Sequence, residues 1–129
     1  MTELEELDRR YASGQFDAIR GDLERFLAAH REEIVRCIAE LAGVSPADAV
    51  KRYIIGHRTI NAERDISEQL EEIRKEKWIR GVQDGCAPDP QKVAADWSRQ
   101  YSAAWRAHRI TAIVYVFERE KERFLKLLA

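Results

Sequence analysis

The sequence predicts an all-α protein, and three observations support this. Glycine and proline are scarce, with six and three residues in a chain of 129. Apolar side chains recur at spacings of three and four residues, the period of one helix face. Helix start signals precede several of these stretches. We therefore expect an elongated antiparallel bundle of three long helices plus a short N-terminal helix, in a single domain over residues 1–129.

The first two helices are expected from a start signal and an apolar seam. Thr2 with Glu5 three residues later forms a capping box, so a short helix begins there and ends near Ser13 and Gly14. A second helix is expected from about residue 16 to residue 42, where Gly43 follows it. Its narrow apolar seam is typical of a helix in a bundle.

The third helix has the clearest start signal in the chain. Ser45 can cap it, and Pro46 occupies its first position, where proline is favoured. We expect this helix to continue to about residues 78–82, with Ile66, Leu70 and Ile73 as a thin apolar line in a strongly charged half. Gly56 lies within it and marks either a close helix approach or a break.

The last helix is expected to begin at Pro90, after the loop at residues 83–89, and to continue to the C-terminus. An aromatic stripe on one side should contact the rest of the bundle. A second apolar face on the opposite side is surplus in a three-helix bundle, so we expect a homodimer or higher oligomer there. The alternative is that the short first helix covers it. The predicted interface residues are Ile110, Ile113, Val114, Phe117, Phe124 and Leu128.

Three histidines lie on three different expected helices, at His30, His57 and His108. If the second and third helices are antiparallel, His30 and His57 lie level, and His108 comes within one to two turns of them. Bundle cores hold metal and cofactor sites, and histidine is a common ligand, so a metal or haem site is one hypothesis. No Glu-x-x-His or HExxH motif supports it. The alternatives are ordinary core or surface histidines and a pH-sensitive interface.

Charge suggests a third hypothesis, although the net charge of −1 offers no bulk attraction to nucleic acid. Residues 86–129 are net basic, whereas residues 1–43 are net acidic. Arg99, Arg106 and Arg109 alternate with tryptophan and tyrosine, a mixture that can contact a phosphate backbone and stack on bases. The alternative is that the aromatic side chains are core and the arginines are solvated.

Several function classes lack their sequence signals. No nucleophile with an adjacent base, phosphate-binding loop or cofactor motif is present, so we expect neither an enzyme nor a cofactor. We expect no signal peptide, membrane span or disulfide framework, and hence a cytoplasmic protein. The sequence favours a non-enzymatic interaction or scaffolding module that self-associates through its C-terminal helix. The partner is a second copy or another protein chain, rather than nucleic acid or membrane.

Overall fold

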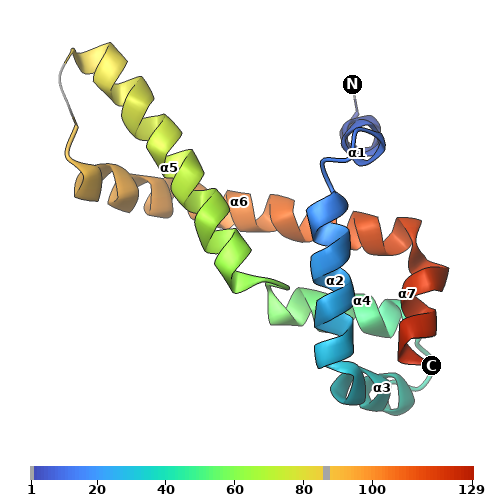
Figure 1. The fold of residues 1–129 in the computed structure, drawn as a ribbon. Helices are drawn as coiled ribbons and strands as arrows, with labels where there is room; N and C mark the ends of the chain where they lie inside the picture. Colours follow the sequence, from blue (N-terminus) through green and yellow to red (C-terminus); the bar gives the residue numbers. More distant parts are fainter. Residues whose placement is uncertain (1, 86–87) are drawn as a thin grey trace. The chain divides into compact units, whose positions relative to one another are not determined.

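A computed structural model describes residues 2–85 and 88–129, and over these residues every regular element is helical (Figure 1). The prediction of an all-α protein is confirmed. Residues 86 and 87, in the expected loop, lie outside the described residues. The described helices are α1 Glu3–Ala12, α2 Asp17–Ala29, α3 Arg31–Glu40, α4 Pro46–His57, α5 Ala62–Asp84, α6 Pro90–Arg119 and α7 Lys121–Leu128.

The predicted helix starts at Thr2 and Ser45 are confirmed by their capping bonds. The Thr2 hydroxyl accepts a hydrogen bond from the backbone N–H of Glu5 at 3.1 Å. The Ser45 hydroxyl accepts from the N–H of Asp48 at 3.2 Å, with Pro46 at the first position of α4. Both bonds satisfy a backbone donor that the first helical turn leaves without a partner.

The prediction of one helix over residues 16–42 is wrong, because the chain bends at His30. This residue has φ −108° and ψ 16°, and it ends α2 and precedes α3. Its backbone N–H still donates to the carbonyl of Phe26, while its own carbonyl accepts from Ile34. The bend therefore retains helical hydrogen bonds on both sides, and it places the fully buried Ile34 in the core between α3, α4 and α7.

The helix predicted from Pro46 to residues 78–82 is also divided, into α4 and α5. Gly56 lies inside α4, so it does not break the helix. The break follows at Arg58, whose φ of 70° is left-handed, and α5 begins after Asn61. The Asn61 side chain accepts from the N–H of Arg64 at 3.0 Å, a cap that supports the new start.

Arg58 is the one non-glycine residue with a positive φ in the described chain. A left-handed conformation strains any residue that has a Cβ, and glycine relieves that strain. We expect Arg58→Gly to raise the free energy of unfolding by about 0.5–1 kcal/mol, measured by urea denaturation followed by circular dichroism. The control is Arg52→Gly, at an exposed site inside α4, where glycine should cost about 1 kcal/mol. A lower stability of Arg58→Gly would contradict the prediction.

The last predicted helix, over residues 90–129, is likewise two helices. Glu120 has φ −122° and ψ 27° and separates α6 from α7. The prediction of three long helices plus a short one is therefore corrected to seven helices over residues 2–85 and 88–129, and each of the three long predicted helices is interrupted. The residues at these two bends, His30 and Glu120, are neither glycine nor proline. The bends therefore follow from packing and not from a helix-breaking residue.

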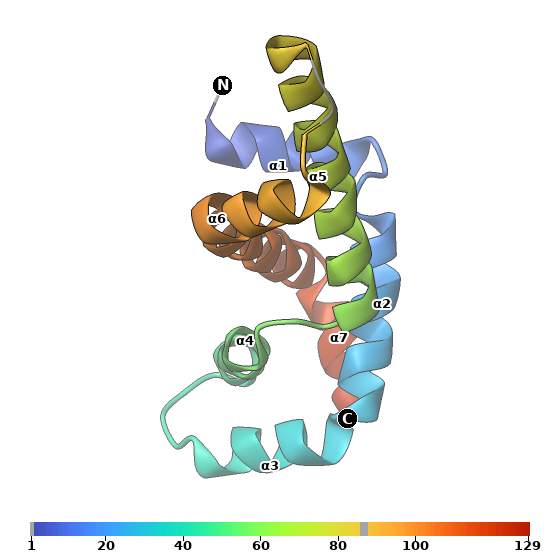
Figure 2. The same cartoon turned by 90° about the vertical axis from the view of Figure 1, so that its left-hand side faces the viewer.

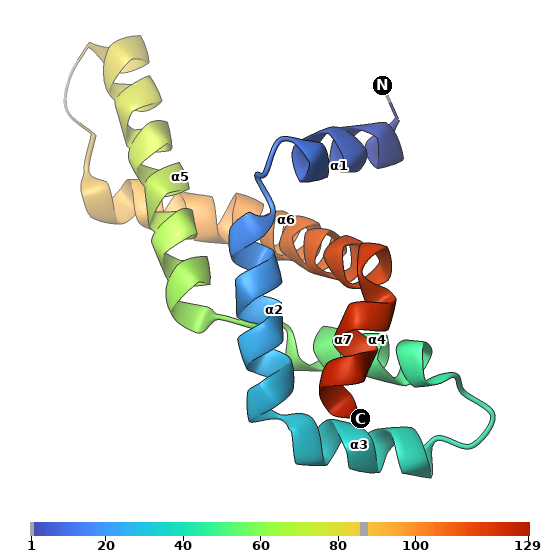
Figure 3. The same cartoon turned by 45° about the vertical axis from the view of Figure 1, so that its right-hand side comes forward.

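The chain divides into two compact units. The terminal unit comprises Met1–Ile60 and Arg109–Ala129, and the hairpin unit comprises Asn61–His108. In the terminal unit α7 contacts α2, α3 and α4 (Figure 3). Residues 41–45 connect α3 to α4, which pack against each other (Figure 2). The buried cluster of this unit consists of Phe16, Ile19, Leu23, Phe26, Leu27, Ile34, Val50, Ile54, Ala112, Ile113, Val116, Phe117, Phe124 and Leu128.

The hairpin unit consists of α5 and the first part of α6. Of its residues whose burial is described, only Asp65, Val93 and Trp97 are buried. The two helices are joined by polar contacts, among them the Arg80–Asp96 ion pair at 3.0 Å. Two helices alone cannot enclose a core, so this unit keeps apolar side chains on its surface. In neither unit does a described helix have the length and apolar character needed to cross a bilayer.

Candidate functional site

Most of the predicted interface residues are buried in the core of the terminal unit. Ile113 is 1% exposed, and Phe117 and Phe124 are fully buried with their rings stacked at 6.0 Å between centroids. Leu128 is buried as well, whereas Ile110 and Val114 are partly buried. Four of the six side chains are thus core residues of the chain itself, and a second subunit could reach them only if the unit opened.

The second apolar face of the predicted last helix, now divided between α6 and α7, is covered within the chain. The bend at Glu120 and the packing of α7 against α2 provide this cover. The bend folds α7 back against α2, so Phe124 and Leu128 enter the same cluster as Leu23 and Leu27. The short α1 packs near Tyr115, where the Tyr11 ring lies 5.8 Å from it between centroids. The apolar surface that indicated a subunit interface is therefore used for intramolecular packing.

Two of the three candidate metal ligands come together. The His30 and His57 rings lie 4.7 Å apart between centroids, as expected if the two histidines are level. Phe26 and Tyr53 complete a packed group of four rings, with all their centroid distances between 4.5 and 5.9 Å. His108 belongs to the hairpin unit.

A hydrogen-bond chain runs through this ring cluster. The Tyr53 hydroxyl donates to the Glu33 carboxylate, and its oxygen lies 3.1 Å from His30 Nδ1. Because the phenol has only one proton, His30 Nδ1 donates to it. Burial and the Glu33 hydrogen bond raise the pKa of Tyr53 to about 12. That same hydrogen bond lowers the pKa of Glu33, with a further electrostatic contribution from His30. The phenol therefore stays protonated near neutral pH and serves as a hydrogen-bond donor.

The ring cluster offers few ligands for a metal. Within residues 2–85 and 88–129 no group of three or more His, Cys, Asp or Glu side chains has a metal-binding arrangement. Catalytic zinc sites use three protein ligands, and structural sites use four. His30 and His57 supply two nitrogen ligands, and His30 Nδ1 is already bonded to Tyr53. The observed contacts are those of packed and hydrogen-bonded rings.

The arginines of the nucleic-acid hypothesis are divided between the units. Arg99 and Arg106 lie in the hairpin unit, and Arg109 lies in the terminal unit. Arg99 pairs with Asp96 at 2.5 Å. Trp97 is 6% exposed, so its ring is not available to stack on a base, whereas Tyr101 is exposed. The expected alternation of cations and aromatic rings therefore combines core and surface side chains.

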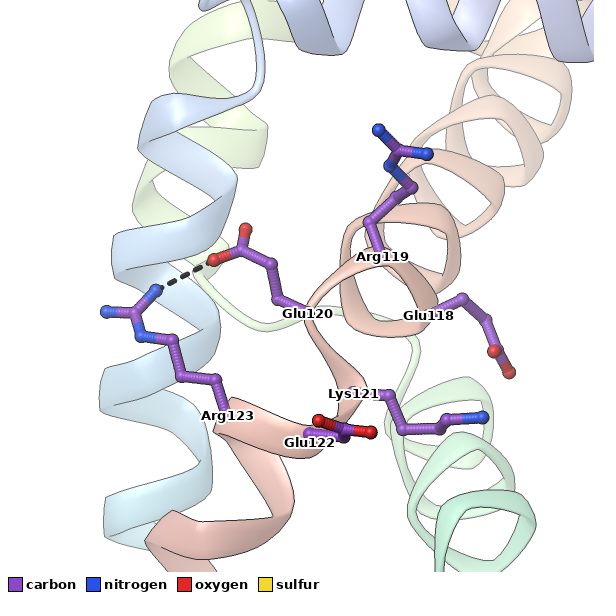
Figure 4. Close-up of a pocket in the computed structure, with 6 residues that line it drawn as sticks. All are labelled: Glu118, Arg119, Glu120, Lys121, Glu122 and Arg123. Atoms are coloured by element: carbon purple, nitrogen blue, oxygen red, sulfur yellow. Dashed lines mark hydrogen bonds and ion pairs between the residues drawn. The ribbon is translucent and has the colours of Figure 1, made fainter.

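A hollow of about 360 Å³ lies at the bend between α6 and α7 (Figure 4). It is lined by three acidic and three basic residues, so opposite charges balance within it. Glu118 pairs with Lys51 of α4, and Arg123 pairs with Glu24 of α2. The six lining residues are Glu118, Arg119, Glu120, Lys121, Glu122 and Arg123.

Glu120 is the centre of the polar contacts at this bend. Its carboxylate accepts from Arg20 Nε at 2.6 Å, from the Tyr11 hydroxyl at 3.0 Å and from Arg123 Nη1 at 2.9 Å. Partial burial opposes ionisation, but these hydrogen bonds outweigh it and lower the pKa of Glu120. Because α1, α2, α6 and α7 meet through this carboxylate, we interpret the bend as a structural joint.

In the hairpin unit, four exposed apolar side chains follow a regular pattern along α5. Ile66, Leu70, Trp78 and Val82 are 59%, 45%, 71% and 64% exposed. Together with Arg74, whose side chain is 70% exposed, they stand at every fourth residue of α5. Residues four apart form a continuous ridge on a helix surface, the element that packs into the groove of another helix. We call these five residues the α5 ridge.

A surface hollow of about 370 Å³ lies beside the C-terminal half of the α5 ridge. Trp78, Val82 and Pro88 contribute apolar surface, and Arg74 and Lys77 contribute positive charge; Gly81 completes the lining. This combination can bind an apolar segment that carries acidic side chains.

The sequence predicted a thin apolar line of Ile66, Leu70 and Ile73 in this helix, but not the exposed ridge that continues from Ile66 and Leu70 to Trp78 and Val82. The spacing of four residues from 66 to 82 was the available signal. Compared with protein-family models, with curated proteins and with solved structures, the chain gives no significant match, so its function has to be inferred from its own surfaces.

Proposed function

We propose that the protein is a non-enzymatic helical interaction module that binds a partner helix along the α5 ridge. The observation that carries this proposal is the exposure of four apolar side chains in helical register on α5. Exposed apolar patches on small domains often mark protein-binding surfaces. The proposal transfers the binding surface from the C-terminal helix to α5, because Phe117, Phe124 and two other predicted interface residues are used in the core.

The chemistry of the partner follows from the hollow beside Trp78. Its apolar lining fits leucine-like side chains, and Arg74 and Lys77 favour acidic neighbours on the same helix. An amphipathic helix that lays its apolar face into such a groove is an established mode of peptide recognition. The partner we propose is therefore an acidic amphipathic helix.

Binding of a designed peptide tests this proposal. The probe is a synthetic helix with leucine at every fourth position and glutamate around it, and the comparison is the same peptide with lysine for glutamate. We expect the acidic peptide to bind in calorimetry and to shift the emission of the exposed Trp78 to shorter wavelength. Trp78→Ala should weaken binding about tenfold, since aromatic anchors dominate helix-binding surfaces.

Leu127→Ala is the matched control. Leu127 is 44% exposed but lies on α7 in the terminal unit, so its truncation should leave the affinity unchanged. Equal binding of the acidic and the basic peptide would contradict the proposed charge preference. The proposed function itself would be contradicted if neither peptide bound at a peptide concentration of about 1 mM. A Kd of about 1 mM corresponds to a binding free energy of only about −4 kcal/mol.

A further inference from the structure

We infer that the helix bound beside Trp78 is α1 of a second copy of this chain, with Leu4 inserted in the hollow at the C-terminal half of the α5 ridge. This inference rests on the proposed function and identifies its partner. Three features support it: the lining of the hollow is arranged to receive one side chain, Leu4 is an exposed apolar side chain among acidic residues, and α1 is held on its own chain by its other end.

The lining of the hollow has the arrangement that receives one side chain of a crossing helix. Four of its residues stand at positions i, i+3, i+4 and i+7 of α5: Arg74, Lys77, Trp78 and Gly81. Four residues at this spacing form the hole that accepts a knob in helix–helix packing. Gly81 has no side chain, so the surface sinks between its neighbours. With Trp78 and Val82 on one side, the hole fits an apolar knob.

The matching knob is on α1. Among the helices described over residues 2–85 and 88–129, α1 alone has no buried residue. Leu4 is 61% exposed, more than any other leucine whose burial is described. The first turn of α1 contains Glu3, Glu5 and Glu6 and no basic residue. α1 therefore has the chemistry expected of the partner, an acidic helix with an apolar side chain to bury.

The charges agree whichever way α1 crosses α5. Glu3 and Glu5 project about 100° to either side of Leu4, since an α-helix has 3.6 residues per turn. Lys77 lies at one edge of the hole and is exposed, as are both glutamates. In either direction of α1, one of the two carboxylates lies on the side of Lys77 and the other faces solvent. This pairing occurs at a single crossing point, so it requires no longer register along the two helices.

The C-terminal half of α1 fixes the helix on its own chain. The Tyr11 hydroxyl donates to the Glu120 carboxylate at 3.0 Å, and the Tyr115 hydroxyl donates to Asp8. Leu4 lies about 6 Å beyond Asp8 along the helix, at 1.5 Å per residue. A helix of ten residues is marginal by itself in water, so these contacts keep α1 helical and lower the ordering cost of binding.

This contact joins two different surfaces, so each copy can both insert Leu4 and receive it. Such heterologous contacts continue from copy to copy and close into a ring or extend as an open chain. The association is between the terminal unit of one copy and the hairpin unit of the next.

Sedimentation velocity of the full chain from about 5 to about 500 μM tests the association. We expect the weight-average sedimentation coefficient to rise with concentration, with a Kd on the order of 100 μM because the contact is small. Leu4→Ala and Trp78→Ala each remove one side of the contact, so each should weaken association at least about tenfold. Leu127→Ala truncates another exposed leucine, on α7, and should leave association unchanged.

An equal mixture of the Leu4→Ala and Trp78→Ala variants tests which surfaces meet. The first variant retains the hollow and the second retains Leu4, so one contact can form between them. The mixture should give a 1:1 heterodimer with the affinity of a single wild-type contact, and it should not grow further. Only the Leu4→Ala variant contains Trp78, so a shift of its emission to shorter wavelength on mixing reports an occupied hollow.

A charge variant tests the role of Lys77. Lys77→Glu places like charges together and should weaken association about tenfold. Lys92→Glu makes the same change at an exposed residue of α6 and should leave association unchanged. All the substituted side chains are exposed, and circular dichroism of each variant verifies that its helix content is retained.

Three results would overturn the inference: a wild-type protein that stays monomeric over this range, a Leu4→Ala variant that associates as tightly as wild type, or a mixture that forms no heterodimer. A monomeric wild type whose Trp78 emission is changed by Leu4→Ala would assign α1 to the hollow of its own chain, which overturns the inference as well. A monomeric wild type that still binds the acidic peptide would leave the proposed function standing, whereas one that binds no peptide would remove both.

Discussion

Phe117→Ala should lower the free energy of unfolding of the terminal unit by about 3–5 kcal/mol, the usual cost of truncating a fully buried aromatic side chain. Phe117 is completely buried, and its ring stacks on Phe124 across the bend between α6 and α7. The truncation leaves a cavity between α6, α7 and the helices that cover them. Urea denaturation followed by far-ultraviolet circular dichroism measures the change.

Leu127→Ala provides the control for Phe117→Ala, because it truncates an exposed apolar side chain of the same unit. It should change stability by no more than about 0.5 kcal/mol. All three tryptophans, at 78, 97 and 105, lie in the hairpin unit, so their fluorescence follows that unit separately. A loss under about 1 kcal/mol in Phe117→Ala would be too small for a buried aromatic residue and would contradict the core described above.

Phe117→Asp distinguishes the observed core from the predicted subunit interface. If Phe117 were a subunit interface residue, aspartate would convert an oligomer to a soluble monomer. In the observed fold an unpaired carboxylate at this fully buried position would unfold the terminal unit. Circular dichroism distinguishes a folded monomer from an unfolded chain.

Glu120→Gln is expected to have the second largest effect, a loss of about 2 kcal/mol at neutral pH, since hydrogen bonds to charged groups contribute about 1.5–3 kcal/mol. The substitution removes the negative charge that accepts from Arg20, Tyr11 and Arg123. It also places an amide N–H₂ where a carboxylate oxygen accepted hydrogen bonds. Urea denaturation at pH 7 measures the loss.

The pH dependence of this effect follows from the lowered pKa of Glu120. Between the folded-state pKa and the ordinary glutamate value of about 4.3, the unfolded chain binds more protons, so stability falls as the pH falls. The contribution of Glu120 is complete above about pH 5 and is lost as the pH falls through its folded-state pKa. The difference between wild type and Glu120→Gln should therefore shrink below about pH 4.

Glu122→Gln is the matched control for Glu120→Gln. Glu122 lines the same hollow but is exposed, so its substitution should change stability by no more than about 0.5 kcal/mol. If Glu120→Gln were as stable as Glu122→Gln at pH 7, the carboxylate of Glu120 would not be the joint that we describe.

The helix starts could be predicted from the sequence, because the signals are local. Thr2, Ser45 and Pro46 act within one helical turn, and the structure has helices beginning at α1 and α4 as expected. Asn61 belongs to the same class of signal and could have been used, since its side chain caps α5. The sequence also predicted that His30 and His57 lie level on two antiparallel helices, because the rise per residue of an α-helix is constant. Their rings are indeed in contact.

The bends could not be predicted in the same way. His30 and Glu120 are both compatible with a helix interior, and each bend keeps backbone hydrogen bonds on both sides. Their positions follow from where Ile34 and Phe124 must lie to enter the core, a condition set by segments distant in sequence. The periodicity at residues 110–128 predicts an apolar face that needs cover, but whether another subunit or the chain itself covers it depends on the bend at Glu120.

The sequence by itself determined that this protein is all-α, where most of its helices start, and which side chains need to be buried, because helical propensity, capping and periodicity act over a few residues. Only the tertiary structure decided that the C-terminal apolar face is internal and that the α5 ridge is exposed. Both outcomes depend on which distant helices pack together. α2 and α7 cover one apolar surface, while a two-helix hairpin has too few neighbours to cover the other.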